Sequence, residues 1–177
     1  MKEIHKTIKR IEKKFQKISL NKDSLLGFQI RPNTKFKKGL NTTQINELET
    51  QFGFEFPIEY KLMLTIINGL DKKQISINPE NLSDIEFDDR FYQYPRDFNK
   101  CQLIINEIEK YIKHVQNALL IESFDINEIE GFIPIYAHRA IVVFKNKNIC
   151  PVISIYGDDV IIYGKNLTEY LENEFLN

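Results

Sequence analysis

The stretch GLNTTQINELETQFGFEFPIEYKLMLTIINGL (residues 39–70) decides the fold, because it contains two helical patterns joined by a short corner. Before the first pattern, the Asn-Thr-Thr run at 41–43 offers side chains that cap free backbone N–H groups. Gly53 supplies the backbone freedom to leave this first helix. Its apolar residues lie three or four positions apart: Ile45, Leu48 and Phe52.

The second pattern predicts another short helix. Phe56-Pro57 begins it, since proline at the first helical position loses no hydrogen bond. Asn68-Gly69 is suited to the left-handed turn that would end it. The apolar residues form one broad stripe: Tyr60, Leu62, Met63, Leu64, Ile66 and Ile67. Both helices must therefore bury a face.

The order and spacing of motifs in this stretch resemble the signature of the SUKH superfamily. That superfamily includes fungal cell-wall synthesis regulators and bacterial immunity proteins of polymorphic toxin systems. The chain departs from the pattern at Leu70, where the family often has a second glycine, and it has no tryptophan. The matching motifs are Leu48-Glu49, Phe52-Gly53, Phe56-Pro57, Glu59-Tyr60-Lys61, Met63-Leu64 and Asn68-Gly69.

The resemblance implies a single α+β domain with a central, mainly antiparallel sheet flanked by helices. We expect residues 39–177 to form this SUKH-like domain, and residues 1–38 to add a basic amphipathic helix and a connector to the same globular unit. The resemblance also implies a binding protein and not an enzyme. The sequence has no phosphate-binding glycine loop, dinucleotide fingerprint or zinc-site spacing, so we expect no cofactor and no metal ion.

The composition is typical of a folded, soluble protein, with 42% hydrophobic and 28% charged residues in 177. Apolar runs are far shorter than the ~20 residues that cross a bilayer, and the lysine-rich start has no signal-peptide core. We therefore expect a cytoplasmic protein. Cys101 and Cys150 have no metal-site spacing, which favours buried thiols.

The net charge of −1 conceals a strong asymmetry. Residues 1–38 carry 12 Lys and Arg against 3 Asp and Glu, a balance of +9, which leaves −10 for residues 39–177. Such a division bears on partners and association rates rather than on fold.

The basic end predicts a helix over residues 2–18 with one narrow apolar stripe. Its lysine face has two interpretations, a surface for nucleic acid or anionic membrane, or the solvated side of a docking helix. The narrow stripe and the lack of interleaved aromatic residues favour docking, so we expect neither nucleic acid nor membrane as a partner. A short strand is expected at Leu26 to Ile30. The stripe consists of Ile4, Ile8, Ile11, Phe15 and Ile18.

Two acidic segments are the candidate partner-binding sites, at 84–94 and 122–130. Strand-like alternation occurs at 75–77 and 85–87, and the first segment also carries aromatic residues suited to anchoring a protein partner. A divalent-metal site is the alternative, but the glycine of a calcium loop is missing. The candidates are Asp84, Glu86, Asp88, Asp89, Phe91, Tyr92, Tyr94, Glu122, Asp125, Glu128 and Glu130.

Residues 99–119 predict one long core helix, with His114 off its apolar stripe. The last third changes to β-branched and aromatic runs separated by short turns, which predicts an antiparallel meander. Asn166 and Glu169 then predict a capping box at the start of a final helix. Its expected inner face is Leu167, Tyr170, Leu171 and Phe175.

The best catalytic alternative combines His138-Arg139 with Asp158 and Asp159, where a strand end would gather a base, a cation and carboxylates. The two aspartates also fit an ordinary hairpin turn. Glu49, Glu59 and Lys61 suggest acid–base chemistry, but support of helix ends is the favoured interpretation.

The leading hypothesis is an immunity protein that binds a basic toxin domain, such as a nuclease, through its acidic and aromatic residues. A regulatory or scaffolding module related to cell-wall synthesis regulators is the alternative, followed by a hydrolase that uses His138. The sequence leaves the oligomeric state open.

Overall fold

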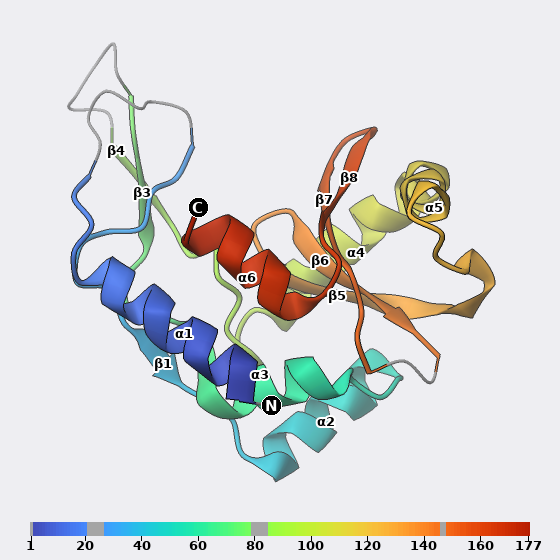
Figure 1. Ribbon diagram of the computed structural model, residues 1–177, viewed down its shortest axis with the longest axis horizontal. Helices are drawn as coiled ribbons and strands as arrows, with labels where there is room; N and C mark the ends of the chain where they lie inside the picture. The colour runs from blue at the N-terminus through green and yellow to red at the C-terminus, as the bar shows by residue number, and fades with distance from the viewer. Residues whose placement is uncertain (1, 21–26, 79–84, 146–147) are drawn as a thin grey trace.

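The centre of the protein is a four-stranded antiparallel sheet with the order β5-β6-β7-β8. The computed structural model describes residues 2–20, 27–78, 85–145 and 148–177. Sequence neighbours pair throughout the sheet, so the predicted meander and the α+β class are confirmed (Figure 1). Residues 140–144 are all buried, because both faces of β6 are covered. The strands are β5 (Ile129–Tyr136), β6 (Arg139–Phe144), β7 (Val152–Tyr156) and β8 (Asp159–Gly164).

The two ends of the chain lie together, because α1 (Lys2–Phe15) packs against α6 (Leu167–Phe175). The ring of Phe15 meets that of Phe175 at 5.8 Å, and Arg10 pairs with Glu172 at 2.5 Å. Ile4, Ile8, Ile11 and Phe15 are all buried, as are the four predicted inner residues of α6. The apolar stripe of α1 is thus a docking surface of the core.

The cap of α6 differs in detail from the predicted box. The side chain of Asn166 accepts a hydrogen bond from the Glu169 N–H at 2.8 Å, as expected. The Glu169 carboxylate, however, accepts from the N–H of Lys165 at 2.9 Å and not from that of Asn166. The reciprocal bond of the predicted box is thus displaced by one residue.

The two helices of residues 39–70 form as predicted, as α2 (Thr42–Phe52) and α3 (Ile58–Ile66). Asn41 and Gln44 make a complete capping box, and Gly53 takes the left-handed conformation that ends α2, with φ of 82°. Pro57 is the N-cap of α3 and not its first helical residue, so the helix begins one position later than expected, at Ile58.

The residues that follow α3 correct one prediction. Residues 67–70 do not form a turn that ends the helix; they form β2 (Ile67–Leu70), which pairs antiparallel with β1 (Phe36–Lys38). Gly69 still needs its positive φ of 89°, and a Cβ there would lie 3.0 Å from Cβ of Gln93. The strand arises because residues 36–38, distant in sequence, supply the pairing edge.

The predicted long helix is also wrong, because it is two helices, α4 (Phe98–Lys110) and α5 (Ile112–Ile121). The chain bends at Tyr111, whose ψ of 24° is outside the helical range. The bend places α4 against β5 and α5 against β8, which are opposite edges of the sheet. His114 is exposed, as expected.

The predicted strands near residues 75 and 85 are confirmed as β3 (Gln74–Ile77) and β4 (Ile85–Asp88), an antiparallel pair at one end of the molecule (Figure 1). Gln29 makes an isolated bridge to Ile75, which is the observed part of the strand expected at 26–30; Leu26 lies outside the described residues. Cys101 and Cys150 are buried. Within the described residues, no helix has the length and apolarity to span a bilayer.

Candidate protein-binding site

The polar residues of the resemblance motif hold elements together. The Glu49 carboxylate accepts a hydrogen bond from the Phe56 N–H at 2.7 Å and pairs with Lys61 at 3.2 Å, which joins α2 to α3. The Glu59 carboxylate accepts from the Leu167 N–H at 3.3 Å, which joins α3 to the start of α6. Partial burial raises the pKa of Glu59. These contacts agree with the expected support of helix ends.

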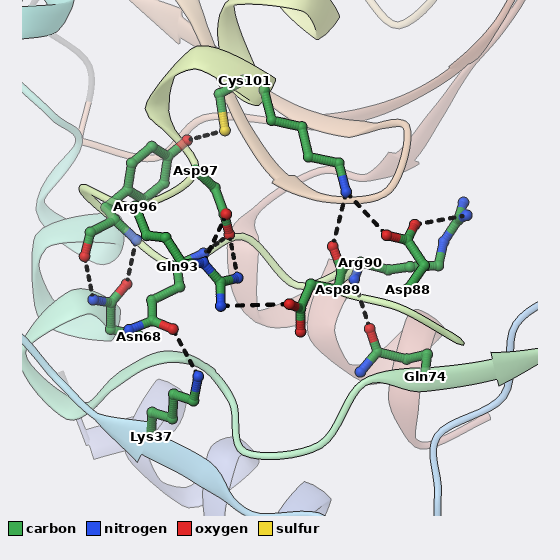
Figure 2. Close-up of polar contacts among 12 residues, drawn as sticks. Lys37, Asn68, Gln74, Asp88, Asp89, Arg90, Gln93, Arg96, Asp97 and Cys101 are labelled. Atoms are coloured by element: carbon green, nitrogen blue, oxygen red, sulfur yellow. Dashed lines mark hydrogen bonds and ion pairs between the residues drawn. The ribbon is translucent and has the colours of Figure 1, made fainter. Parts of the chain in front are cut away.

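The segment from Asp88 to Cys101, here called the 88–101 segment, is fastened to the core by Asn68 (Figure 2). The buried Asn68 amide donates to the Tyr94 carbonyl at 2.6 Å, and its oxygen accepts from the Tyr94 N–H at 2.9 Å. The Tyr94 hydroxyl donates to the Pro134 carbonyl at 2.8 Å and contacts Sγ of Cys101 at 3.1 Å. Burial raises the pKa of the Cys101 thiol to about 12.

The aromatic residues of this segment correct the predicted binding site. Phe91, Tyr92 and Tyr94 are buried and do not form an exposed set of anchors. The reason is that residues 90–92 run beside the end of β5, where Tyr92 N–H bonds to the Ile135 carbonyl at 3.1 Å and Phe91 bridges to Tyr136. Their rings therefore fill the core.

The acidic residues of the 88–101 segment are neutralised locally. Asp88 pairs with Arg90 at 3.7 Å and with Lys100 at 3.2 Å. Arg96 pairs with Asp89 at 3.4 Å and with Asp97 at 2.6 Å (Figure 2). The predicted role of Asp88 and Asp89 as free acidic contacts is therefore weakened. Glu86 is exposed on β4, and Asp84 lies outside the described residues.

The second predicted acidic set lies between the end of α5 and the start of β5, an edge strand of the sheet. Glu122 is exposed and pairs with Lys165 at 2.9 Å, while Asp125 caps the short 3₁₀ helix Ile126–Glu128. Glu128 is half-buried, and Glu130 is exposed on β5. The two acidic segments thus precede and follow α4 in the sequence. Among the described residues, the carboxylates of the second segment make fewer ion pairs than those of the first.

The catalytic alternative requires His138 and Arg139 to lie beside Asp158 and Asp159, and the structure does not show this arrangement. Arg139 pairs with Glu174 at 3.0 Å and donates to the Ser154 hydroxyl at 2.8 Å. Within the described part of the chain, Asp158 and Asp159 make no ion pair with His138 or Arg139, and both belong to the β7–β8 hairpin. The ring of His138 lies 6.0 Å from that of Tyr156.

The pH response of His138 follows from its surroundings. Burial, together with the charges of Arg139 and Arg90, lowers the pKa of its imidazole to about 4. Between pH 6.5 and about 4 the unfolded chain binds a proton that the folded protein does not, so His138 makes stability fall as pH falls through this range. NMR titration of the ring protons should give a midpoint near pH 4. A midpoint near pH 6.5 would contradict this environment.

A groove that was not predicted from the sequence lies between α5 and β8. It has a volume of about 440 Å³. The sequence did hold a signal of exposed apolar surface here. Leu120 and Ile121 are apolar, but they lie beyond the apolar stripe that was predicted to face the core. The groove is lined from α5 by His114, Asn117, Ala118 and Ile121, from β8 by Val160, Ile161 and Ile162, and also by Glu122 and Asp158.

Neither the search for a metal site nor the comparison with known proteins assigns a function to this chain. Among the described residues, no group of three or more His, Cys, Asp and Glu side chains is placed to hold a metal ion. No protein-family model, curated protein or solved structure gives a significant match to this chain.

Proposed function

We propose that this protein is an immunity protein, a non-enzymatic binding protein that neutralises a basic toxin domain, such as a nuclease, by direct contact. The observation that carries the proposal is the acidic surface of residues 39–177, whose formal charge is −10. Asp125, Glu130, Asp158 and Asp159 are exposed, and within the described residues they have no cation within ion-pair distance.

This charge arrangement suits a partner with a basic cleft. Opposite charges accelerate the encounter of two proteins and favour one register over others. The motif resemblance to the SUKH superfamily points to the same class of protein. In addition, Glu49, Glu59 and Arg139 are engaged in structural contacts, which leaves the binding interpretation ahead of the hydrolytic one.

The test is capture of the partner by the tagged protein from its own cells, followed by growth and rate measurements. We expect the captured chain to be basic, to stop growth when expressed alone, and to be harmless when this protein is co-expressed. The association rate should fall at least about tenfold between about 0.1 M and about 1 M salt, since the screening length shrinks from about 10 Å to about 3 Å.

Paired variants sharpen this test. Glu122→Gln with Glu130→Gln should slow association more than Glu47→Gln with Glu109→Gln, which removes the same charge elsewhere on the surface. Capture of cell-envelope synthesis or signalling proteins without a toxic chain would favour the regulatory alternative. A partner that is toxic but associates at a salt-independent rate would refute the electrostatic argument alone.

A further inference from the structure

The groove between α5 and β8 exposes large apolar side chains to solvent. Ile121 is 81% exposed and Ile161 is 50% exposed, and both line the groove. Tyr156, on the neighbouring strand β7, is 78% exposed. Clustered apolar exposure bordered by polar residues is typical of a protein-interaction site.

The strand wall of the groove is the edge strand of the central sheet, beside which α5 packs. β8 is the last strand in the order of the central sheet. Successive side chains of a strand point to opposite faces, yet the successive residues Val160, Ile161 and Ile162 all line the groove. The backbone edge of β8 must therefore face it. Exposed edges accept an additional strand from another chain.

The charge of the groove selects the occupant. Glu122 and Asp158 line it, Asp159 begins β8, and the described residues of its lining include no lysine or arginine. Lys165 pairs with Glu122 from outside this lining at 2.9 Å, on exposed side chains where such a pair is weak. A segment that places lysine or arginine beside aliphatic residues would satisfy both the carboxylates and the isoleucines.

We propose that the α5–β8 groove binds an extended basic and aliphatic segment of a protein partner, which lies along β8. The identity of that partner as a toxin rests on the proposed function, whereas the chemistry of the groove does not. The groove also gives Glu122, from the second predicted acidic segment, a defined place in the interface. It moves the centre of the expected interface away from the 88–101 segment.

The experiment is an amide NMR titration of the full chain with a synthetic peptide of about eight residues that alternates lysine and valine, long enough for one strand. We expect shift changes to concentrate at residues 117–122 and 158–163. Ile121→Ser should weaken binding at least about tenfold, equivalent to about 1.4 kcal/mol. Because Ile121 is so exposed, this variant should keep the wild-type spectrum elsewhere.

Matched controls distinguish binding in the groove from nonspecific binding to exposed apolar residues. Leu103→Ser removes an apolar side chain that is 68% exposed on α4 and does not line the groove, so it should change affinity less than twofold. A peptide with glutamate in place of lysine should not bind. Equal loss in both serine variants, shifts confined to residues 86–89, or no shifts at millimolar peptide would each overturn the proposal.

Two further outcomes assign the occupant and separate this proposal from the proposed function. Self-association of the wild type that Ile121→Ser abolishes in sedimentation would give the groove to a second copy, and so overturn the partner proposal. If Ile121→Ser binds the toxic partner and the peptide with unchanged affinity, the immunity function stands and the groove proposal fails. If the peptide maps to the groove but no protection is found, the groove stands and the immunity function fails.

Discussion

Replacement of Asn68 by alanine is expected to lower the free energy of unfolding by about 3 kcal/mol, because it leaves two buried backbone groups of Tyr94 without partners. The amide of Asn68 satisfies both the N–H and the carbonyl of Tyr94, at 2.9 Å and 2.6 Å. Each unsatisfied buried group costs about 1–3 kcal/mol. Urea denaturation of both proteins, followed by circular dichroism, measures the difference.

Two other substitutions test this explanation. Asn46→Ala removes an exposed asparagine of α2 and should change stability by no more than about 0.5 kcal/mol. Asn68→Asp keeps the acceptor for the Tyr94 N–H but places a carboxylate against the Tyr94 carbonyl, so it should destabilise at least as strongly as alanine at pH 7. A loss below about 1 kcal/mol in Asn68→Ala would show that water or a rearranged chain replaces the amide.

The contrast between local and distant interactions explains which features the sequence could predict. α2, α3 and the meander follow from periodicity and caps within short windows, such as the Asn41 box. β2 was missed because its partner strand β1 lies about thirty positions earlier, and pairing at that separation leaves no local pattern. The bend at Tyr111 was missed because the apolar spacing continues through it without glycine or proline.

The candidate site was harder to predict because exposure depends on tertiary packing. Phe91 and Tyr92 sit in a run of aspartates, and a composition of this kind is typical of a surface loop. Their backbone instead pairs beside β5, which carries the rings into the core. Glu122 is exposed, but the groove that it lines could not be predicted without placing α5 and β8 side by side.

The second large effect is expected from the ion pair between Arg139 and Glu174. Both side chains are only 14% exposed, and Nε of Arg139 lies 3.0 Å from Oε2 of Glu174. The guanidinium also stacks over the Tyr163 ring at 4.4 Å. Burial already raises the pKa of Glu174, and Arg139 counteracts that effect. Arg139→Met should therefore lower the free energy of unfolding by about 3–4 kcal/mol at pH 7, since it leaves the buried carboxylate of Glu174 without its cation.

The pH dependence gives this prediction its sharpest test. Without Arg139, the pKa of Glu174 rises further above its unfolded value, so the folded state binds more protons than the unfolded state and stability falls as pH rises. The loss of the Arg139 charge also relieves His138, whose pKa that charge lowers. Both effects make the deficit of Arg139→Met relative to wild type shrink as pH falls from 7 toward 5.

The double variant Arg139→Met with Glu174→Gln distinguishes the cost of the unpaired Glu174 carboxylate from the cost of losing the contacts of the Arg139 side chain. Its deficit should be smaller than that of Arg139→Met alone and less dependent on pH, because the buried carboxylate is gone and only the change at His138 remains. Urea denaturation of the four proteins at pH 5 and pH 7 completes the cycle. If Glu174→Gln restores nothing, the stacking of Arg139 on Tyr163 and its bond to Ser154 carry the stability, and the ion pair does not.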